Sequence, residues 1–115
     1  MNSINLVGRL CADPETNQTP NSSVTSIRLA VSGSRKEGDQ WVDDPTFVTC
    51  KAWAEKAEFL QKHFEKGKEI WIMGSLKEER WEKDGEKRSK VVVNISRCGF
   101  TSSNGGKKKD DDIFV

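Results

Sequence analysis

One change of hydrophobic period constrains the fold of this chain more than any other feature. Apolar residues alternate at the two-residue spacing of β-strands in most of the chain, but the segment AEKAEFLQKHFEKG departs from that pattern. There Ala57, Leu60 and Phe64 fall three and four residues apart, which predicts one apolar stripe on a short helix that stops at Gly67. The chain is therefore predicted to be mostly β, with a single helix within the order of strands.

Three strand-period segments precede the helix and two follow it: residues 4–10, 24–32, 47–53, 68–81 and 90–96. The tripeptide KDG at residues 83–85 lies between the last two segments and is typical of a hairpin turn. Three strands, a helix and a long hairpin follow the order of the five-stranded OB-fold barrel, whose helix lies between strands 3 and 4. We therefore predict an all-β OB-fold barrel over residues 1–100.

Two stretches between the predicted strands lack alternation and are predicted to be loops. Residues 11–23 contain Asp13-Pro14 and Pro20-Asn21, which break regular structure. Residues 33–45 are polar and carry the isolated Trp41.

The composition shifts abruptly at Thr101. Residues 101–115, TSSNGGKKKDDDIFV, combine a Gly/Ser/Asn linker, three lysines, three aspartates and an apolar end. Such a segment lacks the apolar residues needed for a packed core, so we predict a flexible, disordered, acidic C-terminal tail.

Composition places the chain in a broad class. Its 115 residues are 34% hydrophobic and 32% charged, as expected for one soluble globular domain. The start, MNSINLVGRL, has no basic n-region and no long apolar run, so we expect neither a signal peptide nor a membrane span, and a cytoplasmic protein. Cys11, Cys50 and Cys98 are widely separated and odd in number, which predicts reduced thiols rather than a disulfide framework.

Net charge argues against one class of partner. The formal charge is only +1, whereas many nucleic-acid-binding domains are strongly basic. Only a local arrangement of cations would make this chain a nucleic-acid-binding protein.

The segment FVTCKAW supplies a candidate for such an arrangement. At strand period, Phe47, Lys51 and Trp53 share one face, while Cys50 and Ala52 lie on the other. The small apolar residues are expected to face the core, which leaves two rings and a lysine on the outer face. Rings and cations together bind single-stranded nucleic acid with little sequence preference.

The predicted hairpin adds a third ring and more cations. Trp81 lies near its outer end, together with the basic residues Lys77, Arg80, Lys87 and Arg88 and several acids. In an OB barrel this hairpin rises beside the surface of strands 2 and 3, so the three rings would form one discontinuous platform with Lys51 and Arg80 among them. An alternative is that the strand-3 aromatics pack under a loop or at a subunit interface.

The chain resembles the bacterial and phage single-stranded DNA-binding proteins over nearly its whole length. The segments that carry the resemblance, in order, are NLVGRLCADPE, SIRLAVS, AEFLQKHFEKG, IWIMGSLKEERW, VVVN and the tail segment DDDI. The resemblance implies an OB fold, usually assembled as a homotetramer, that coats exposed single-stranded DNA in replication, recombination and repair.

The resemblance also assigns roles to individual residues. Phe47 falls where the family commonly has a stacking tryptophan, Trp53 where a stacking phenylalanine is common, and Trp81 at a stacking tryptophan. Lys77 and Arg80 match basic positions beside Trp81.

One position departs from the family pattern. Arg35 falls where some members stack a further tryptophan, so a guanidinium replaces a ring there. Trp41, a few residues on, is a candidate for supplying the missing ring.

The tail resembles the protein-interaction tail of the family. It ends in Asp110, Asp111, Asp112, Ile113, Phe114 and Val115, whereas the family typically ends in aspartates followed by Ile, Pro and Phe. The missing proline and the short linker suit a phage-type member, which would act in the host cytoplasm. We expect the tail to recruit replication and repair proteins.

Catalytic motifs are not apparent, and we predict a protein that is not an enzyme, with no cofactor and no metal. His63 is the only histidine and has no paired acid or thiol in the sequence pattern. Gly67-Lys68 lacks the upstream glycine and the following Ser or Thr of a phosphate-binding loop. Two alternatives are an OB-fold RNA-binding module and a nuclease on an OB scaffold, which would need clustered acids.

Overall fold

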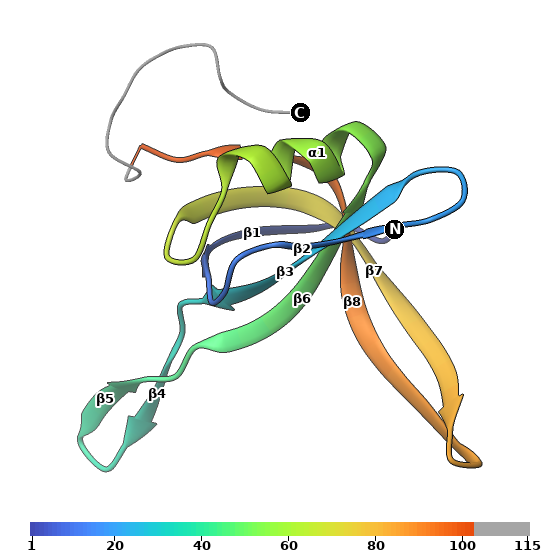
Figure 1. Ribbon diagram of the computed structural model, residues 1–115. Helices are drawn as coiled ribbons and strands as arrows, with labels where there is room; N and C mark the ends of the chain where they lie inside the picture. The colour runs from blue at the N-terminus through green and yellow to red at the C-terminus, as the bar shows by residue number, and fades with distance from the viewer. Residues whose placement is uncertain (103–115) are drawn as a thin grey trace.

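The structure, a computed structural model, describes residues 1–102 and is drawn in Figure 1. Within this range the elements are β1 (Ile4–Leu10), β2 (Glu15–Gln18), β3 (Ser23–Val31), β4 (Ser34–Glu37), β5 (Gln40–Asp43), β6 (Thr46–Trp53), α1 (Ala54–His63), β7 (Glu69–Lys83) and β8 (Glu86–Phe100). Residues 103–115 lie outside the described range, so the prediction of a disordered tail stays a prediction.

Five strands form a closed ring in the order β1-β7-β8-β6-β3, because β1 pairs with both β7 and β3. β2 adds to the outer edge of β3. Neighbouring strands of the ring are antiparallel except for β6 and β8, which run parallel where Cys50–Lys51 meet Val93–Asn94. A five-stranded barrel with its helix between the third and fourth strands of the ring confirms the predicted OB fold.

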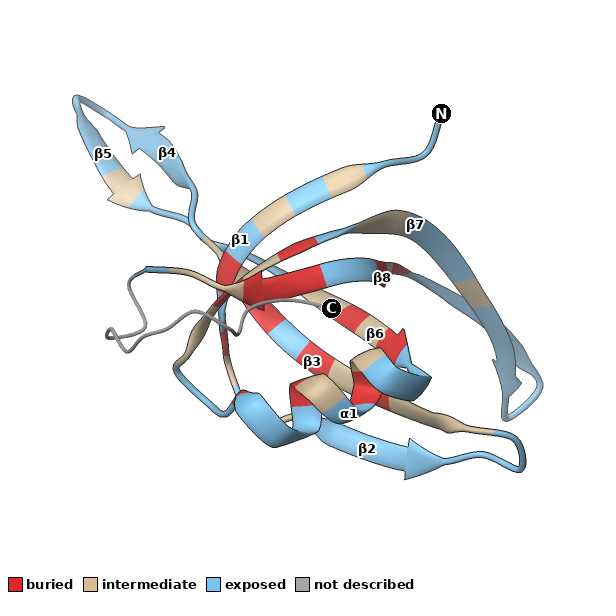
Figure 2. Cartoon of the chain, turned by 90° about the horizontal axis from the view of Figure 1, so that it is seen from above, coloured by how far each residue is buried: buried red, intermediate tan, exposed pale blue. Residues whose placement is uncertain are grey.

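The barrel interior is filled by alternate residues of its strands. Figure 2 shows the buried positions gathered on the ring strands and on the inner side of α1. The core residues are Leu10, Ile27, Leu29, Cys50, Ala52, Leu60, Phe64, Ile70, Ile72, Val93, Ile95 and Cys98. Burial of these side chains is the main stabilising contribution to the fold.

The helix α1 closes one end of the barrel, at the top of Figure 1. Ala57 and Leu60 are its buried residues, and Phe64 follows directly as its C-cap. The helix ends at His63, earlier than predicted, although Gly67 does adopt the positive φ of +92° that a chain reversal requires. The rings of Phe64 and Phe100 stack with centroids 4.9 Å apart, so the last strand packs against the end of the helix.

The β7–β8 hairpin is much longer than the barrel is deep, and it continues beyond it as an arm (Figure 1). Its turn is the predicted one, with φ of +53° at Asp84 and +81° at Gly85, as a type I′ hairpin turn requires. At the barrel wall Gly74 is indispensable, because a Cβ there would lie 2.1 Å from the Asn94 carbonyl oxygen. The strands shift register between Met73 and Gly74, and this β-bulge bends the hairpin.

Parts of the strand prediction were wrong. β2 and the β4–β5 hairpin form where loops were predicted, because their residues are almost all exposed and polar and so carry no alternating pattern. β8 continues to Phe100 rather than stopping at residue 96, since the bulge resets the alternation of buried residues there.

A hydroxyl group ties the helix to the sheet, and its removal is expected to destabilise the fold. Thr25 is fully buried; its Oγ1 donates to the Ala57 carbonyl at 3.0 Å and lies 2.7 Å from the Thr16 hydroxyl. Thr25→Val keeps the side-chain shape but leaves the carbonyl without this donor, so unfolding should cost roughly 1–3 kcal/mol less.

The matched control is Thr46→Val, at an exposed position of β6. Urea unfolding followed by circular dichroism measures both variants. Equal stability of the two would contradict a structural role for the Thr25 hydroxyl.

Candidate nucleic-acid interface

The outer face of β6 carries the two rings predicted from the sequence. Phe47 is 51% exposed and Trp53 is 42% exposed, whereas Cys50 and Ala52 between them are fully buried. Lys51 lies between the rings on the same outer face and is half-buried. Strand alternation therefore presents two aromatic side chains and one cation to the outside of the barrel.

The neighbouring strand β3 adds a cation to this face. Arg28 lies opposite Thr49 in the ladder, and its Nη1 donates to Thr49 Oγ1 at 3.1 Å. The guanidinium carbon also lies 5.9 Å from the centroid of the Phe47 ring, within cation–π distance. Sequence reasoning missed Arg28, although its alternation with the buried Ile27 and Leu29 already indicated an outward side chain.

Two contacts bring one face of the β7–β8 arm against β6. Lys51 Nζ donates to both carboxylate oxygens of Glu79, at 2.8 and 3.1 Å, and Lys90 Nζ donates to Thr49 Oγ1 at 3.3 Å. Glu79 and Lys90 are cross-strand partners, so they share one face of the arm. This face is therefore the one that looks toward β6.

Trp81 lies farther along that same face. It is two residues beyond Glu79 and pairs with Arg88, and its side chain is 43% exposed. Lys77 lies two residues before Glu79 in β7, so strand alternation places it on this face too. The structure thus places Trp81, Lys77 and Arg88 on the same side of the arm as the residues that contact β6.

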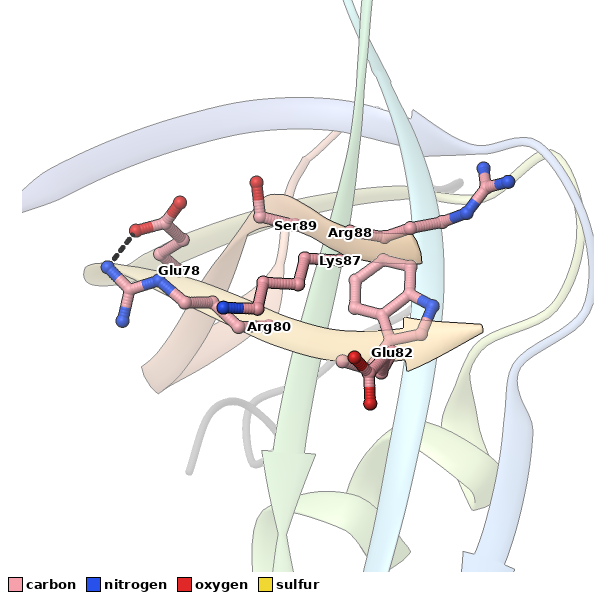
Figure 3. A pocket seen from close by; sticks show the side chains of 7 residues that line it. Glu78, Arg80, Glu82, Lys87, Arg88 and Ser89 are labelled. Carbon is pink, nitrogen blue, oxygen red and sulfur yellow. Dashed lines mark hydrogen bonds and ion pairs between the residues drawn. The ribbon is translucent and has the colours of Figure 1, made fainter. Parts of the chain in front are cut away.

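Arg80 and Lys87 lie on the opposite face of the arm. Arg80 pairs with Ser89, and Lys87 pairs with Glu82, all one position out of phase with Trp81. Figure 3 shows the side chains of Arg80 and Lys87 extending alongside each other while Arg88 points away from them. These residues border a hollow of about 580 Å³ at the arm, which Trp81 and Arg88 also line.

A groove of about 360 Å³ lies at the foot of the arm. Its lining residues are Ala12, Asp13, Glu15, Ser26, Ile27, Arg28, Thr49, Lys51 and Lys90. Val92, two residues beyond Lys90 and on the same face of β8, is fully buried and yet outside the core cluster of the barrel. The groove therefore lies on the outer surface, bordered by β3, β6 and the arm.

The remaining two predicted residues lie on the β4–β5 hairpin, which extends from the barrel in a different direction from the arm (Figures 1 and 2). Arg35 pairs with Val42, whereas Trp41 pairs with Lys36 and is 68% exposed. Arg35 and Trp41 therefore lie on opposite faces of this hairpin. The hypothesis that Trp41 supplies the ring missing at Arg35 stays a prediction, with the two side chains reaching the bound strand from different faces of the hairpin.

Most predicted cations are paired with carboxylates of the same chain. Lys51 pairs with Glu79, Arg80 with Glu78, Arg88 with Glu86, and Arg35 with Glu37 and Asp44. The Lys51–Glu79 pair is the least exposed of these, with side chains 25% and 31% exposed. A polyanion that binds here has to compete with these carboxylates for the cations, and this competition weakens its electrostatic attraction to the surface.

Residues 1–102 hold no cluster of three or more His, Cys, Asp or Glu side chains able to ligate a metal ion. The helix α1, the one helix in that range, is neither long nor apolar enough to cross a membrane.

Residues 1–101 match the model of the single-strand binding protein family. The chain belongs to this family. The single-stranded DNA-binding protein of Borreliella burgdorferi is 34% identical over 98% of this chain and 79% of its own length. That of Treponema pallidum is 32% identical over 99% of this chain, and that of Mycolicibacterium smegmatis is 32% identical over 84%. The chain spans 66% and 61% of the length of these two relatives.

Solved structures of the single-strand binding protein family have the same fold. A deletion mutant of the single-stranded DNA-binding protein from Thermus aquaticus matches with a TM-score of 0.74 and 30% identity, over 85% of this chain and 49% of that one. The Plasmodium falciparum protein in complex with single-stranded DNA also has a TM-score of 0.74, over 83% of this chain and 86% of that one. Its sequence identity is 16%, so it supports the fold alone.

The cysteines of this family member are predicted to differ in reactivity. Burial raises the pKa of Cys50 to about 12, and it raises the pKa of Cys98 to about 11 despite the opposing effect of Lys56. Thiolate is the reactive form, so at about pH 8 both buried thiols should be inert in the folded protein while the half-buried Cys11 reacts.

Titration with an aromatic disulfide reagent should therefore release about one equivalent of the reagent's thiolate per folded chain. In denaturant, where all three cysteines react, it should release three. A Cys11→Ser variant should release none before unfolding. Rapid reaction of all three cysteines in the folded protein would contradict this assignment.

Proposed function

We propose that this chain binds single-stranded DNA without sequence specificity, through base stacking assisted by phosphate contacts. The observation that carries the proposal is the set of exposed rings at one surface, Phe47 and Trp53 on β6 and Trp81 on the arm. Lys51 between the two rings of β6, and Arg28 beside Phe47, supply cations at the same surface. The named activity of the relatives from Treponema and Borreliella supports the same ligand.

Stacking accounts for both the strength and the selectivity of such binding. Each base stacked on an aromatic side chain contributes roughly 1–3 kcal/mol, and every base offers a π-face. Duplex DNA keeps its base faces covered, so this surface selects single strands. The remaining predicted residues, Lys77, Arg80, Lys87 and Arg88 on the arm and Arg35 and Trp41 on the β4–β5 hairpin, are proposed to extend the path of the strand.

The proposed biological role is to cover and protect single-stranded DNA exposed during replication, recombination and repair. A coating protein needs no chemical step, which suits a surface of rings and cations. We place this activity in the bacterial cytoplasm, in a phage-infected host if the chain is phage-encoded.

We propose that the protein acts as a homo-oligomer, a tetramer or a dimer. Val7 on β1 and Met73 on β7 are exposed on the outer wall of the barrel, where Val7 lies opposite the half-buried Trp71. β1 pairs with β3 only at Arg9 and Leu10, so most of that edge of β1 is available to a second copy. Apolar side chains beside a strand edge suit contact between identical subunits.

We propose that Asp110, Asp111, Asp112, Ile113 and Phe114 bind replication and repair proteins. These residues lie outside the described part of the chain, and the proposal rests on their chemistry. Consecutive aspartates suit a basic surface on a partner, and Ile113 with Phe114 suits an adjoining apolar pocket.

Loss of a single ring tests the stacking proposal. Phe47→Ala and Trp81→Ala should each weaken binding to oligo-dT by roughly 1–3 kcal/mol, because each removes one base-stacking surface. Phe47→Trp and Trp81→Phe retain a ring and are the matched controls, expected to bind like the wild-type protein or, for Phe47→Trp, more tightly. Fluorescence anisotropy of a labelled oligonucleotide measures all four.

Circular dichroism should show an unchanged fold for the alanine variants, since both rings point away from the core. An alanine variant that binds as tightly as its aromatic control would remove that residue from the platform.

Truncation separates the two proposed functions of the chain. Removing residues 110–115 should leave affinity for oligo-dT unchanged, or slightly higher at low salt where three aspartates compete with phosphates for the same cations. The same truncation should abolish co-purification with replication and repair enzymes. Ile113→Ala with Phe114→Ala is the charge-matched control, expected to lose the partners without the gain in affinity. A truncated chain that loses affinity for DNA yet keeps its partners would contradict the proposal.

A further inference from the structure

Two cations converge on a single hydroxyl group in the groove at the foot of the arm. Arg28 Nη1 on β3 and Lys90 Nζ on β8 donate to the same acceptor, Thr49 Oγ1 on β6, at 3.1 and 3.3 Å. All three residues line the groove of about 360 Å³. Residues from three strands, distant in sequence, are thus brought to one point by the closure of the barrel.

These two cations differ in one respect from those predicted from the sequence. Within residues 1–102 neither Arg28 nor Lys90 forms an ion pair, whereas Lys51, Arg80 and Arg88 each pair with a glutamate. A threonine hydroxyl carries no net charge, so it cannot neutralise two cations that repel each other. This point on the surface is therefore suited to an anion.

We propose that Arg28, Thr49 and Lys90 form a seat for one backbone phosphate of the bound strand. A phosphodiester offers two anionic oxygens, one for the guanidinium and one for the ammonium, and charge-assisted hydrogen bonds of this kind are stronger than those to a neutral hydroxyl. The Thr49 hydroxyl, released from two donors, can donate its own proton to the same phosphate.

The position of Arg28 links this seat to base stacking. Its guanidinium lies 5.9 Å from the Phe47 ring centroid, so a nucleotide stacked on Phe47 has its backbone within reach of Arg28. The seat would then fix the register of the strand relative to that ring. This inference rests on the proposed binding of single-stranded DNA and specifies where the backbone lies in the groove.

Three carboxylates lie near the seat, and two of them are engaged by other groups of the chain. Glu79 is held by Lys51, and Asp13 accepts the Lys66 backbone N–H at 2.9 Å. The third, Glu15, is the first residue of β2 and lies opposite Ser26 of β3. Of the three cations that line the groove, Lys51 is paired with Glu79, and within residues 1–102 Arg28 and Lys90 have no ion-pair partner.

The salt dependence of binding tests the seat directly. We would measure oligo-dT affinity against salt concentration for the wild-type chain, Arg28→Gln, Lys90→Gln and the double variant. Each single variant should bind roughly tenfold more weakly at moderate salt, and the double variant should lower the log–log slope by about 0.7, the value for one phosphate. Arg28→Lys, which keeps the charge, should retain the wild-type slope.

Lys62→Gln on α1 removes one charge from a residue that does not line the groove and is the matched control, expected to leave the slope unchanged. A double variant that lowers the slope by about 1.4 would show two separate phosphate contacts and overturn the shared seat. Variants that behave like Lys62→Gln would also overturn it while leaving the proposed function intact. A wild-type chain that does not bind oligo-dT would instead overturn the proposed function and the seat together.

Discussion

The rest of the structure depends on one short parallel contact, between Cys50–Lys51 of β6 and Val93–Asn94 of β8. This contact closes the ring of five strands, so the alternate residues of β6 that face inward are sealed in the core. It also makes β8 leave the barrel beside the outer face of β6, carrying the arm with it. Cys50, which packs in the core, and Lys51, which lies between the two exposed rings, are therefore neighbours in β6.

The sequence predicted the barrel well because burial leaves an alternating pattern. The helix and the five strands of the ring all bury one side, and the turn at Asp84–Gly85 needs residues that tolerate positive φ. β2 and the β4–β5 hairpin bury almost nothing, so period-two reasoning has no apolar residue to follow there. The bulge beside Gly74 was equally invisible, since it depends on close contact with the Asn94 carbonyl.

The candidate site was predicted in its rings and only partly in its charges. Outward-facing aromatics in a strand are conspicuous, and Phe47 and Trp53 needed nothing more than alternation. Alternation also separates Arg80 from Trp81, a distinction that counting basic residues overlooks. The pairing of Lys51 with Glu79, and the meeting of Arg28 with Lys90, depend on how strands distant in sequence are joined. A chain with a net charge of only +1 can thus present, within residues 1–102, two cations that no carboxylate pairs with at the proposed phosphate seat.

The central claim is that exposed rings select single-stranded DNA by stacking on its bases. Titration of the intrinsic tryptophan fluorescence with oligo-dT, oligo-U and duplex DNA of equal length tests it most directly, because Trp53 and Trp81 lie at the proposed binding surface. The account predicts strong quenching with oligo-dT, weaker quenching with oligo-U and little with duplex. Equal quenching by duplex DNA, or stronger quenching by oligo-U than by oligo-dT, would contradict it.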